Sequence, residues 1–185
     1  HMDGIFIASP FSLQTDFIDV QRIEVLRGPQ GTLFGQNSTG GAINVISNKP
    51  TTDERFSKAD ITYGDYGMKQ LRSSSNFPIS NNVSTKLSLS AMTREGFTEN
   101  LATGQDLDDA HNLSFRTDWM IDVNDTTSLR IFGQYSSVDR NGAAIRGIDD
   151  QSPGMRKLSQ NTISKQELTS SVFAMIFETD LGYAI

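Results

Sequence analysis

The sequence contains no cysteine and, apart from His1, a single histidine, His111. Without cysteine the chain can form neither a disulfide nor a thiolate zinc site. A Ser–His–Asp triad would have to use His111, which lies beside a predicted strand start, where surface histidines are common. No Gly-x-Ser-x-Gly elbow and no P-loop lysine accompanies the glycines. The sequence therefore predicts no catalytic residue, no cofactor and no metal ligand, and we expect the protein not to be an enzyme.

Charge and hydropathy limit the kinds of partner that the protein can bind and the ways in which it can enter a membrane. The formal net charge is -6, which argues against nucleic acid as a partner, because nucleic-acid binding needs a basic face. No apolar run approaches the roughly 18 residues of a membrane-spanning helix. The mean hydropathy of -0.36 fits a soluble domain, and it also fits membrane strands that are apolar on one face only.

Both ends of the chain look cut. His1 and Met2 resemble the remnant of an expression tag. At the other end, Gly182–Ile185 stops just as a new apolar alternation begins. We therefore expect residues 1–2 to be tag sequence and the chain to be a fragment of a longer protein.

Beyond a polar joint at Thr51–Glu54, the sequence alternates with period two, as half-buried strands do. The predicted strands cover residues 58–63, 68–79, 83–91, 112–121, 129–136 and 169–179. Alternate positions on one face are charged at Lys58, Asp60, Lys86, Arg116, Asp118 and Arg130. The opposite face carries Leu87, Leu89, Phe115, Trp119 and Ile131.

The connections between these strands alternate in length. From the second connection onward, short turns at 78–82, 122–125 and 179–182 alternate with long loops at 95–110 and 139–165. Bacterial outer-membrane barrels show this pattern, with tight turns on the periplasmic side and long loops outside the cell. A Greek-key sandwich has no reason to keep this alternation. Aromatic residues near the strand ends fit either an interfacial girdle or ordinary strand preference. They are Tyr63, Tyr66, Phe97, Trp119, Tyr135 and Tyr183.

The two long loops carry the other candidate binding residues. Asp106, Asp108 and Asp109 offer oxygens to calcium, but the Gly and the distal Glu of an EF-hand loop are missing, which favours a solvated acidic loop. The second loop, Asp139–Lys157, is rich in glycine and charge, and loops of that length are usually functional or disordered.

The densest motif is Ile23–Pro50, IEVLRGPQGTLFGQNSTGGAINVISNKP. Its glycines mark places where the backbone turns sharply or approaches another segment closely. Strands are expected at 3–8, 19–26 and 41–47. The motif residues with a structural or gating role are Glu24, Arg27, Gly28, Pro29, Gly31, Gly35, Gly40 and Gly41. The stretch closely resembles the late part of the plug domain of TonB-dependent outer-membrane receptors.

The resemblance implies an all-β fold. Residues 3–50 would be the C-terminal part of a plug, which is mixed α+β and mostly β. Residues 51–185 would be about six antiparallel up-and-down strands of a transmembrane β-barrel and the start of a seventh, from a barrel of about 22 strands. The charged face would line the lumen and touch the plug, and the apolar face would meet lipid. Arg27 would pair with wall carboxylates on strands beyond this chain.

The resemblance also implies a function. Such receptors sit in the outer membrane of Gram-negative bacteria and perform energised uptake of a scarce nutrient, most often a ferric siderophore or another iron complex. The implied partners are TonB, outer-membrane lipid and a small nutrient ligand. TonB would grip a segment missing from this chain, so the fragment is expected to be transport-incompetent. The residues that contact the substrate stay unknown at this point.

A soluble extracellular or periplasmic β-sandwich that binds carbohydrate or protein is the alternative from another class. The apolar row decides between the two, because a sandwich buries Leu87, Phe115 and Trp119 between two sheets. A barrel wall leaves the same side chains exposed. A β-rich hydrolase, the third possibility, lacks a nucleophile–base pair.

Overall fold

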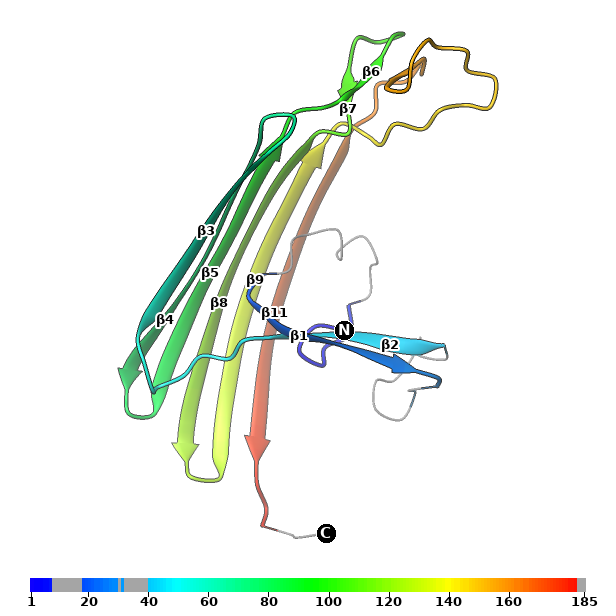
Figure 1. Ribbon diagram of the computed structural model, residues 1–185. Helices are drawn as coiled ribbons and strands as arrows, with labels where there is room; N and C mark the ends of the chain where they lie inside the picture. Colours follow the sequence, from blue (N-terminus) through cyan, green and yellow to red (C-terminus); the bar gives the residue numbers. More distant parts are fainter. Residues whose placement is uncertain (8–17, 30, 32–39, 183–185) are drawn as a thin grey trace.

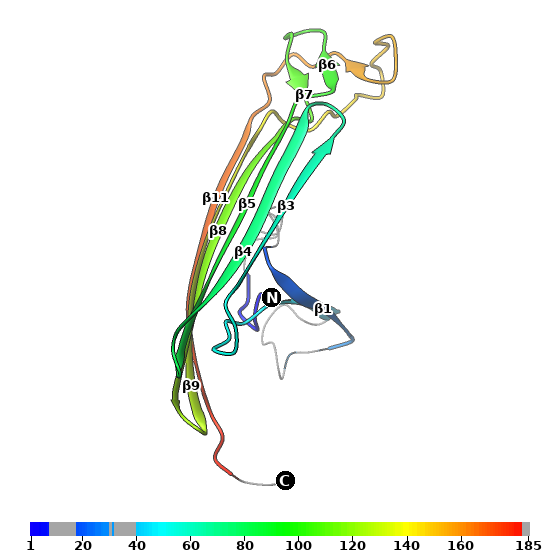
Figure 2. The ribbon, with the colours of Figure 1, turned by 60° about the vertical axis from the view of Figure 1, so that its left-hand side comes forward.

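The structure is a computed structural model that describes residues 1–7, 18–29, 31 and 40–182. A large, curved sheet dominates it, and a small two-stranded sheet lies against its concave side (Figures 1 and 2). Within the described ranges, no helix is long and apolar enough to cross a membrane.

The large sheet is a simple antiparallel meander. Its strand order is β3-β4-β5-β8-β9-β11, so each strand pairs with the next long strand in the sequence. The strands are β3 (Phe56–Gly64), β4 (Met68–Ser80), β5 (Val83–Arg94), β8 (Ala110–Asn124), β9 (Thr127–Arg140) and β11 (Gln166–Thr179). This confirms the predicted all-β, up-and-down arrangement, and the strands extend beyond the predicted bounds because the ladders continue through polar residues.

From the β4–β5 turn onward, the connections sort by length onto the two ends of the sheet, while the short β3–β4 turn lies at the same end as the long loops. The β4–β5 and β8–β9 turns lie at the lower end in Figure 1, and both long loops lie at the upper end. The upper loops carry three short strands that form a sheet of their own, in the order β10-β6-β7. They are β6 (Thr98–Asn100), β7 (Asp106–Leu107) and β10 (Lys157–Leu158), and the sequence did not predict them. The predicted alternation of tight turns and long loops is therefore confirmed.

The two faces of the large sheet differ in polarity. On the concave face Lys86, Arg116, Asp118 and Arg130 are each no more than 4% exposed. Lys58 lies on the same face, because it is opposite Ser74 on β4, which in turn is opposite Ser88 on β5. The Lys58 side chain is nevertheless exposed. Asp60, two residues further along β3, is exposed as well.

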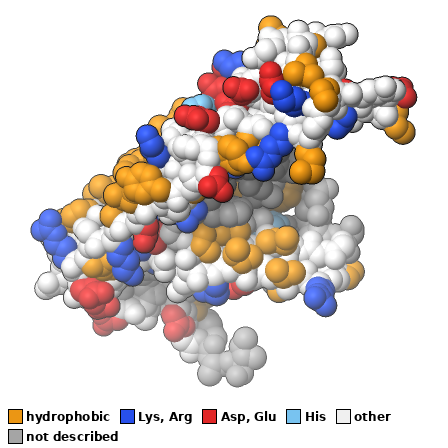
Figure 3. Space-filling view, turned by 45° about the horizontal axis from the view of Figure 1, so that its top comes forward, with side chains coloured by type: hydrophobic (Ala, Val, Ile, Leu, Met, Phe, Trp, Pro, Cys, Tyr) orange, Lys and Arg blue, Asp and Glu red, His pale blue; other side chains and the backbone are white. Residues whose placement is uncertain are grey.

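The convex face is apolar and uncovered. Leu87 is 40% exposed, Phe115 42% and Trp119 39%, and exposed hydrophobic side chains line the left flank of the molecule in Figure 3. A sandwich would bury these three residues against a second sheet. The structure therefore contradicts the sandwich alternative.

The small sheet pairs β1 (Val20–Arg27) with β2 (Gly41–Ser47) in antiparallel register. Both strands match their predicted positions. Gly41 lies opposite Arg27 with φ +142°, and a Cβ there would come within 2.5 Å of the Leu26 carbonyl oxygen. The close approach explains why glycine occupies this position.

The strand predicted at residues 3–8 is wrong for its described part. Instead, the chain turns at Asp3 and Gly4, whose φ angles are 48° and 80°, and Met2 and Ile5 exchange two backbone hydrogen bonds of 2.9 Å. Positive φ at both central residues is what a type I′ turn requires, and Asp-Gly is its usual sequence. Met2 is buried and pairs with Val45, and the assignment of residues 1–2 to a tag stays a prediction.

Candidate functional site

A buried ionic cluster joins the small sheet to the large one. Asp3, in the N-terminal turn, and Ser47, at the end of β2, contribute from the small sheet. Arg116 and Asp118 on β8 and Arg130 on β9 contribute from the concave face of the large sheet. The four charged side chains are only 2–5% exposed. Two acids and two bases make the cluster neutral overall.

Asp118 holds both arginines in place. Its Oδ1 accepts a hydrogen bond from Arg130 Nε at 3.0 Å, and its Oδ2 accepts one from Arg130 Nη2 at 2.6 Å. The same Oδ2 accepts a bond from Arg116 Nη2 at 3.0 Å. Arg116 also lies over the Phe132 ring, 4.1 Å from its centroid, which adds a cation–π contact. The two guanidinium groups are thereby aimed at the small sheet.

Asp3, on the side of the small sheet, forms ion pairs with both arginines. Arg116 Nη2 lies 2.8 Å from Asp3 Oδ2, and Arg130 Nη1 lies 3.4 Å from Asp3 Oδ1. The backbone N–H of Ser47 donates to Asp3 at 2.9 Å, and Arg130 Nη2 donates to Ser47 Oγ at 2.8 Å. Removing one partner from such a cluster leaves a buried charge uncompensated, which is costly.

The pKa of Asp3 gives the contact a pH dependence. Burial raises the pKa of this carboxyl, but the Ser47 N–H and the Arg130 and Arg116 guanidiniums together bring it below its ordinary value of 3.8. A carboxyl with a lowered folded-state pKa stabilises fully above its unfolded pKa, and loses that stabilisation as pH falls through the folded pKa. We therefore expect the small sheet to stay attached from neutral pH down to about 4 and to loosen below it.

Proteolysis or hydrogen exchange of β2 across a pH titration measures this loosening. Asp3→Asn provides the control, because it removes the titrating group and should abolish the transition below pH 4. A transition that persists in Asp3→Asn would assign the loosening to another group.

A second charged contact joins the sheets at β5. Lys86 Nζ lies 2.5 Å from Asp19 Oδ2, and the Lys86 side chain is 4% exposed. Asp19 precedes β1 with φ 55°, and its other oxygen accepts a bond from Asn48 at 2.9 Å. Asp19 thus ties the start of β1 to both the end of β2 and the large sheet.

The motif residues singled out from the sequence lie mostly at the far end of the small sheet. Glu24 pairs with Arg22 at 2.8 Å and accepts a bond from Asn44, and the hydrogen bonds from Arg22 and Asn44 lower the pKa of Glu24. The side chain of Arg27 is exposed at the end of β1, and its pairing with wall carboxylates stays a prediction. Of the turn-forming residues, Gly28 has φ 84°, while Pro29, Gly31 and Gly40 are exposed and Gly35 lies outside the described residues.

Sequence reasoning placed the charged face correctly but missed its partners in the small sheet. Asp3 and Asp19 are the acids that the wall arginines and lysine meet. The dipeptide Asp3-Gly4 is a turn signal in the sequence, but the strand predicted at residues 3–8 includes it. The pairing of these acids with charges more than 60 residues away depends on tertiary packing, so no local pattern encodes it.

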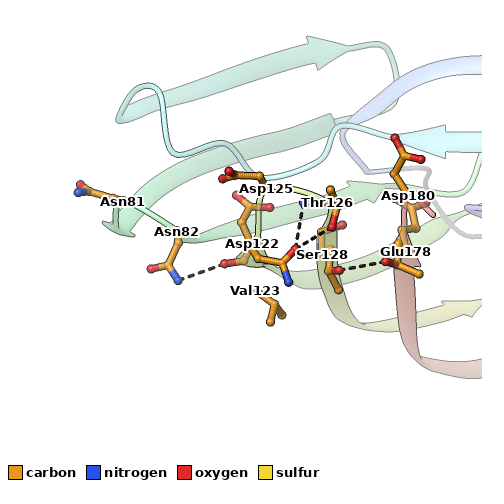
Figure 4. Close-up of a pocket in the computed structure, with 12 residues that line it drawn as sticks. Asn81, Asn82, Asp122, Val123, Asp125, Thr126, Ser128, Glu178 and Asp180 are labelled. Carbon is orange, nitrogen blue, oxygen red and sulfur yellow. Dashed lines mark hydrogen bonds between the residues drawn. The ribbon is translucent and has the colours of Figure 1, made fainter. Parts of the chain in front are cut away.

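Among the hollows that border the sheets in the described part of the chain, one adjoins the ionic cluster and another lies among the turns. A cleft of about 670 Å³ lies between the small sheet and strands β9 and β11, and Asp3 and Arg130 form part of its wall. A second hollow, of about 850 Å³, lies among the lower turns (Figure 4). Asp122, Asp125, Glu178 and Asp180 line the second hollow, yet no group of residues in the described part of the chain is arranged to hold a metal ion.

The comparisons with known proteins agree with this geometry. The family TonB-dependent Receptor Plug Domain matches residues 1–42. The pesticin receptor of Yersinia pestis is 42% identical over 55 residues, which are 30% of this chain and 8% of that protein. The metal-pseudopaline receptor CntO of Pseudomonas aeruginosa is 28% identical over 105 residues, 56% of this chain and 14% of that protein. The chain thus spans a small part of the length of these relatives.

Solved structures show the same fold over nearly the whole chain. The ferripyoverdine receptor of the Pseudomonas aeruginosa outer membrane superposes with a TM-score of 0.75 at 20% identity, covering 96% of this chain and 25% of that one. The ferric yersiniabactin uptake receptor of Yersinia pestis gives a TM-score of 0.68 at 21% identity, covering 87% of this chain and 26% of that one.

Proposed function

The chain belongs to the TonB-dependent receptors of the outer membrane, and we propose that its receptor performs energised uptake of a ferric siderophore or a similar metal chelate. The small sheet is then part of the plug, and the large sheet is part of the barrel wall. We assign residues 3–50 to the plug and residues 51–185 to the wall. Transport is proposed for the whole receptor and not for this chain alone.

The ionic cluster is the observation that carries this proposal. Charged side chains hold the plug to the wall through Asp3, Arg116 and Arg130, so the described contact is polar where a permanent core would be apolar. Separated ions regain hydration when water enters, whereas separated apolar surfaces stay exposed to water at a cost. The 670 Å³ cleft beside the cluster gives water a place to enter. Such a contact suits a plug that must move and return.

The joint between plug and wall supports a fixed pivot. Asn76 on β4 is fully buried, and its side-chain amide donates to the carbonyl oxygens of Thr51 and Glu54 at 2.9 and 2.6 Å. Its Oδ1 accepts the Thr51 N–H at 3.0 Å. We propose that this joint stays on the wall while the ionic contacts break. TonB would supply the work through a segment outside this chain, since ligand binding shifts a plug only by its differential affinity for two states.

The names of the relatives support a metal chelate as the substrate class. They include receptors for metal-pseudopaline, ferric enterobactin and ferripyoverdine. The charge balance of the described plug–wall contact is neutral, so it does not favour a ligand of either sign by itself.

Radioactive iron uptake tests the proposal. The whole receptor would be expressed in a strain deprived of its own siderophore receptors and supplied with defined ⁵⁵Fe-loaded hydroxamate, catecholate and mixed-type chelates. We expect uptake of at least one chelate, abolished by a protonophore. Uptake of none of them, or uptake insensitive to the protonophore, would contradict the proposal.

A further inference from the structure

The two long outer loops are joined to each other by backbone pairing. Strands β6 and β10 are parallel neighbours, with Glu99 opposite Lys157 and Asn100 opposite Leu158. The Glu99 N–H donates to the Arg156 carbonyl oxygen at 3.0 Å, and the Leu101 N–H donates to that of Leu158 at 2.8 Å. Residues 57 or 58 positions apart therefore share one small sheet at the top of Figure 1.

Asn100 is the centre of this junction. Its side chain is fully buried, its Nδ2 donates to the Gln160 carbonyl oxygen at 3.0 Å, and its Oδ1 accepts the Gln160 N–H at 3.0 Å. Leu107 and Leu158 are 0% and 2% exposed beside it. A buried amide with both ends satisfied across two loops stabilises their association, and its loss leaves buried polar groups unpaired.

A second set of bonds lies nearer the wall. Asp109 Oδ1 accepts the Asn141 N–H at 2.6 Å, and Asp108 Oδ1 accepts the Ala144 N–H at 3.2 Å. The expectation of a solvated acidic loop is therefore wrong for these two residues, because backbone N–H groups of the other loop occupy their carboxylates. Gln105 and Ser164 exchange two further bonds, of 3.0 and 3.2 Å.

The charges of the two loops are complementary. Residues 95–109 contain five acids and neither lysine nor arginine. Residues 141–165 contain four basic and two acidic residues, for a net charge of +2. Lys157 and Glu99 meet at 2.8 Å, but both are half-exposed, so this pair adds little by itself. The loops match each other in charge and in hydrogen bonding.

The base of the two loops is closely packed. A Cβ on Gly96 would lie 2.7 Å from the Asp106 carbonyl carbon, and a Cβ on Gly142 would lie 2.5 Å from Ser164 Cβ. Above this base, Arg156 lies over the rings of Tyr66 and Phe97, at 4.9 and 5.6 Å. The Arg156 contact reaches from the second loop to the β3–β4 turn.

We propose that residues 95–109 and 141–165 form one cap, which is assembled before any ligand arrives and moves as a single body, fastened to the β3–β4 turn by Arg156. Loops that are already ordered lose less conformational entropy when a ligand binds than loops that must be ordered by it. The cap is a property of the free receptor, so it stands independently of the substrate proposed above.

Hydrogen exchange of the whole receptor in lipid nanodiscs, without ligand, tests the cap. In the wild type we expect the amides of the two loops to exchange with one common opening rate. Asn100→Ala should accelerate exchange in both loops by about tenfold to a hundredfold, because a buried two-sided bond is lost. Asn161→Ala, at an exposed position of the second loop, should change neither. The β8–β9 ladder amides should stay protected in both variants.

Arg156→Gln separates the cap from its fastening. It should accelerate exchange of the Glu95 amide, which donates to the Tyr66 carbonyl oxygen at 2.9 Å, by severalfold, and leave Glu99 and Leu101 protected. Two loops that exchange at unrelated rates, or an Asn100→Ala effect confined to one loop, would overturn the proposal of a single body. Loss of Glu99 and Leu101 protection in Arg156→Gln would overturn the assignment of Arg156 to fastening the cap to the β3–β4 turn, because Arg156 would then also hold the two loops together.

Discussion

Replacing Asp118 by asparagine is expected to release the plug from the wall. Asp118 is the wall acid that both Arg116 and Arg130 contact, and without its charge the two guanidiniums share Asp3 alone. Removing one partner from a buried ionic cluster costs about 3–5 kcal/mol, because it leaves buried charge uncompensated. We therefore expect the plug contact to open readily while the sheet remains intact.

Hydrogen exchange of the β2 amides in the whole receptor measures this release. The amide of Val45 in β2 and the amide of Asn48, which directly follows β2, bond to His1 and Asp19 and should exchange much faster in Asp118→Asn. Asp60→Asn is the matched control, since Asp60 lies on the same face but is exposed. Unchanged β2 protection in Asp118→Asn would contradict the account. Loss of protection in the β8–β9 ladder as well would indicate unfolding of the wall instead of plug release.

An arginine at Leu87 should destabilise the receptor in a bilayer. Leu87 is on the convex face, opposite Thr117 in the middle of the 15-residue strand β8. An arginine facing lipid near the bilayer midplane costs about 2–4 kcal/mol, and the cost falls towards the interfaces. We expect a denaturant titration of the receptor, refolded in lipid vesicles, to show a loss of this size.

Ile148→Arg is the matched control for Leu87→Arg. It makes the same kind of exchange at a fully exposed loop residue, where water solvates the new charge, and should leave stability unchanged within about 0.5 kcal/mol. Equal stability of Leu87→Arg and the wild type would mean that the convex face does not contact lipid.

The expected effects of Asp118→Asn and Leu87→Arg have different physical origins. At Asp118 the cost comes from a charge that loses its partner inside the protein, and at Leu87 it comes from a charge placed in hydrocarbon. The contrast follows from the alternation of the strands, since Lys86 and Ser88, the neighbours of Leu87, face the plug side and are 4% and 3% exposed. Moving a substitution by one residue therefore changes which face of the sheet it tests.

Most of the wall could be predicted from the sequence. The alternation of apolar with polar residues and that of short turns with long loops are patterns that can be read directly from the sequence. The alternation of Leu87 with Lys86 and of Phe115 with Arg116 therefore already assigns the two faces of the sheet. The antiparallel meander follows from the short turns, because consecutive strands joined by tight turns pair with each other.

The plug contact and the cap could not be predicted in the same way. Asp3 meets Arg116 across 113 residues, and Asn100 meets Gln160 across 60, so neither pair has a local signature. The short strands β6 and β10 are 3 and 2 residues long, below the length at which alternation is visible. Only the turn at Asp3-Gly4 offered a signal, because this dipeptide favours positive φ at both positions.

A spin-label scan of strand β8 in the reconstituted receptor tests the central claim most directly. If the large sheet is a barrel wall, one face of strand β8 meets lipid and the other face meets the plug. Labels at positions 113, 115, 119 and 121 should be accessible to oxygen dissolved in the bilayer and shielded from a water-soluble nickel reagent. A label at Ser114, which is 1% exposed, should be shielded from both. Loss of this alternation, or nickel access at 115 and 119, would contradict the assignment of a lipid-facing wall that holds a plug on its inner side.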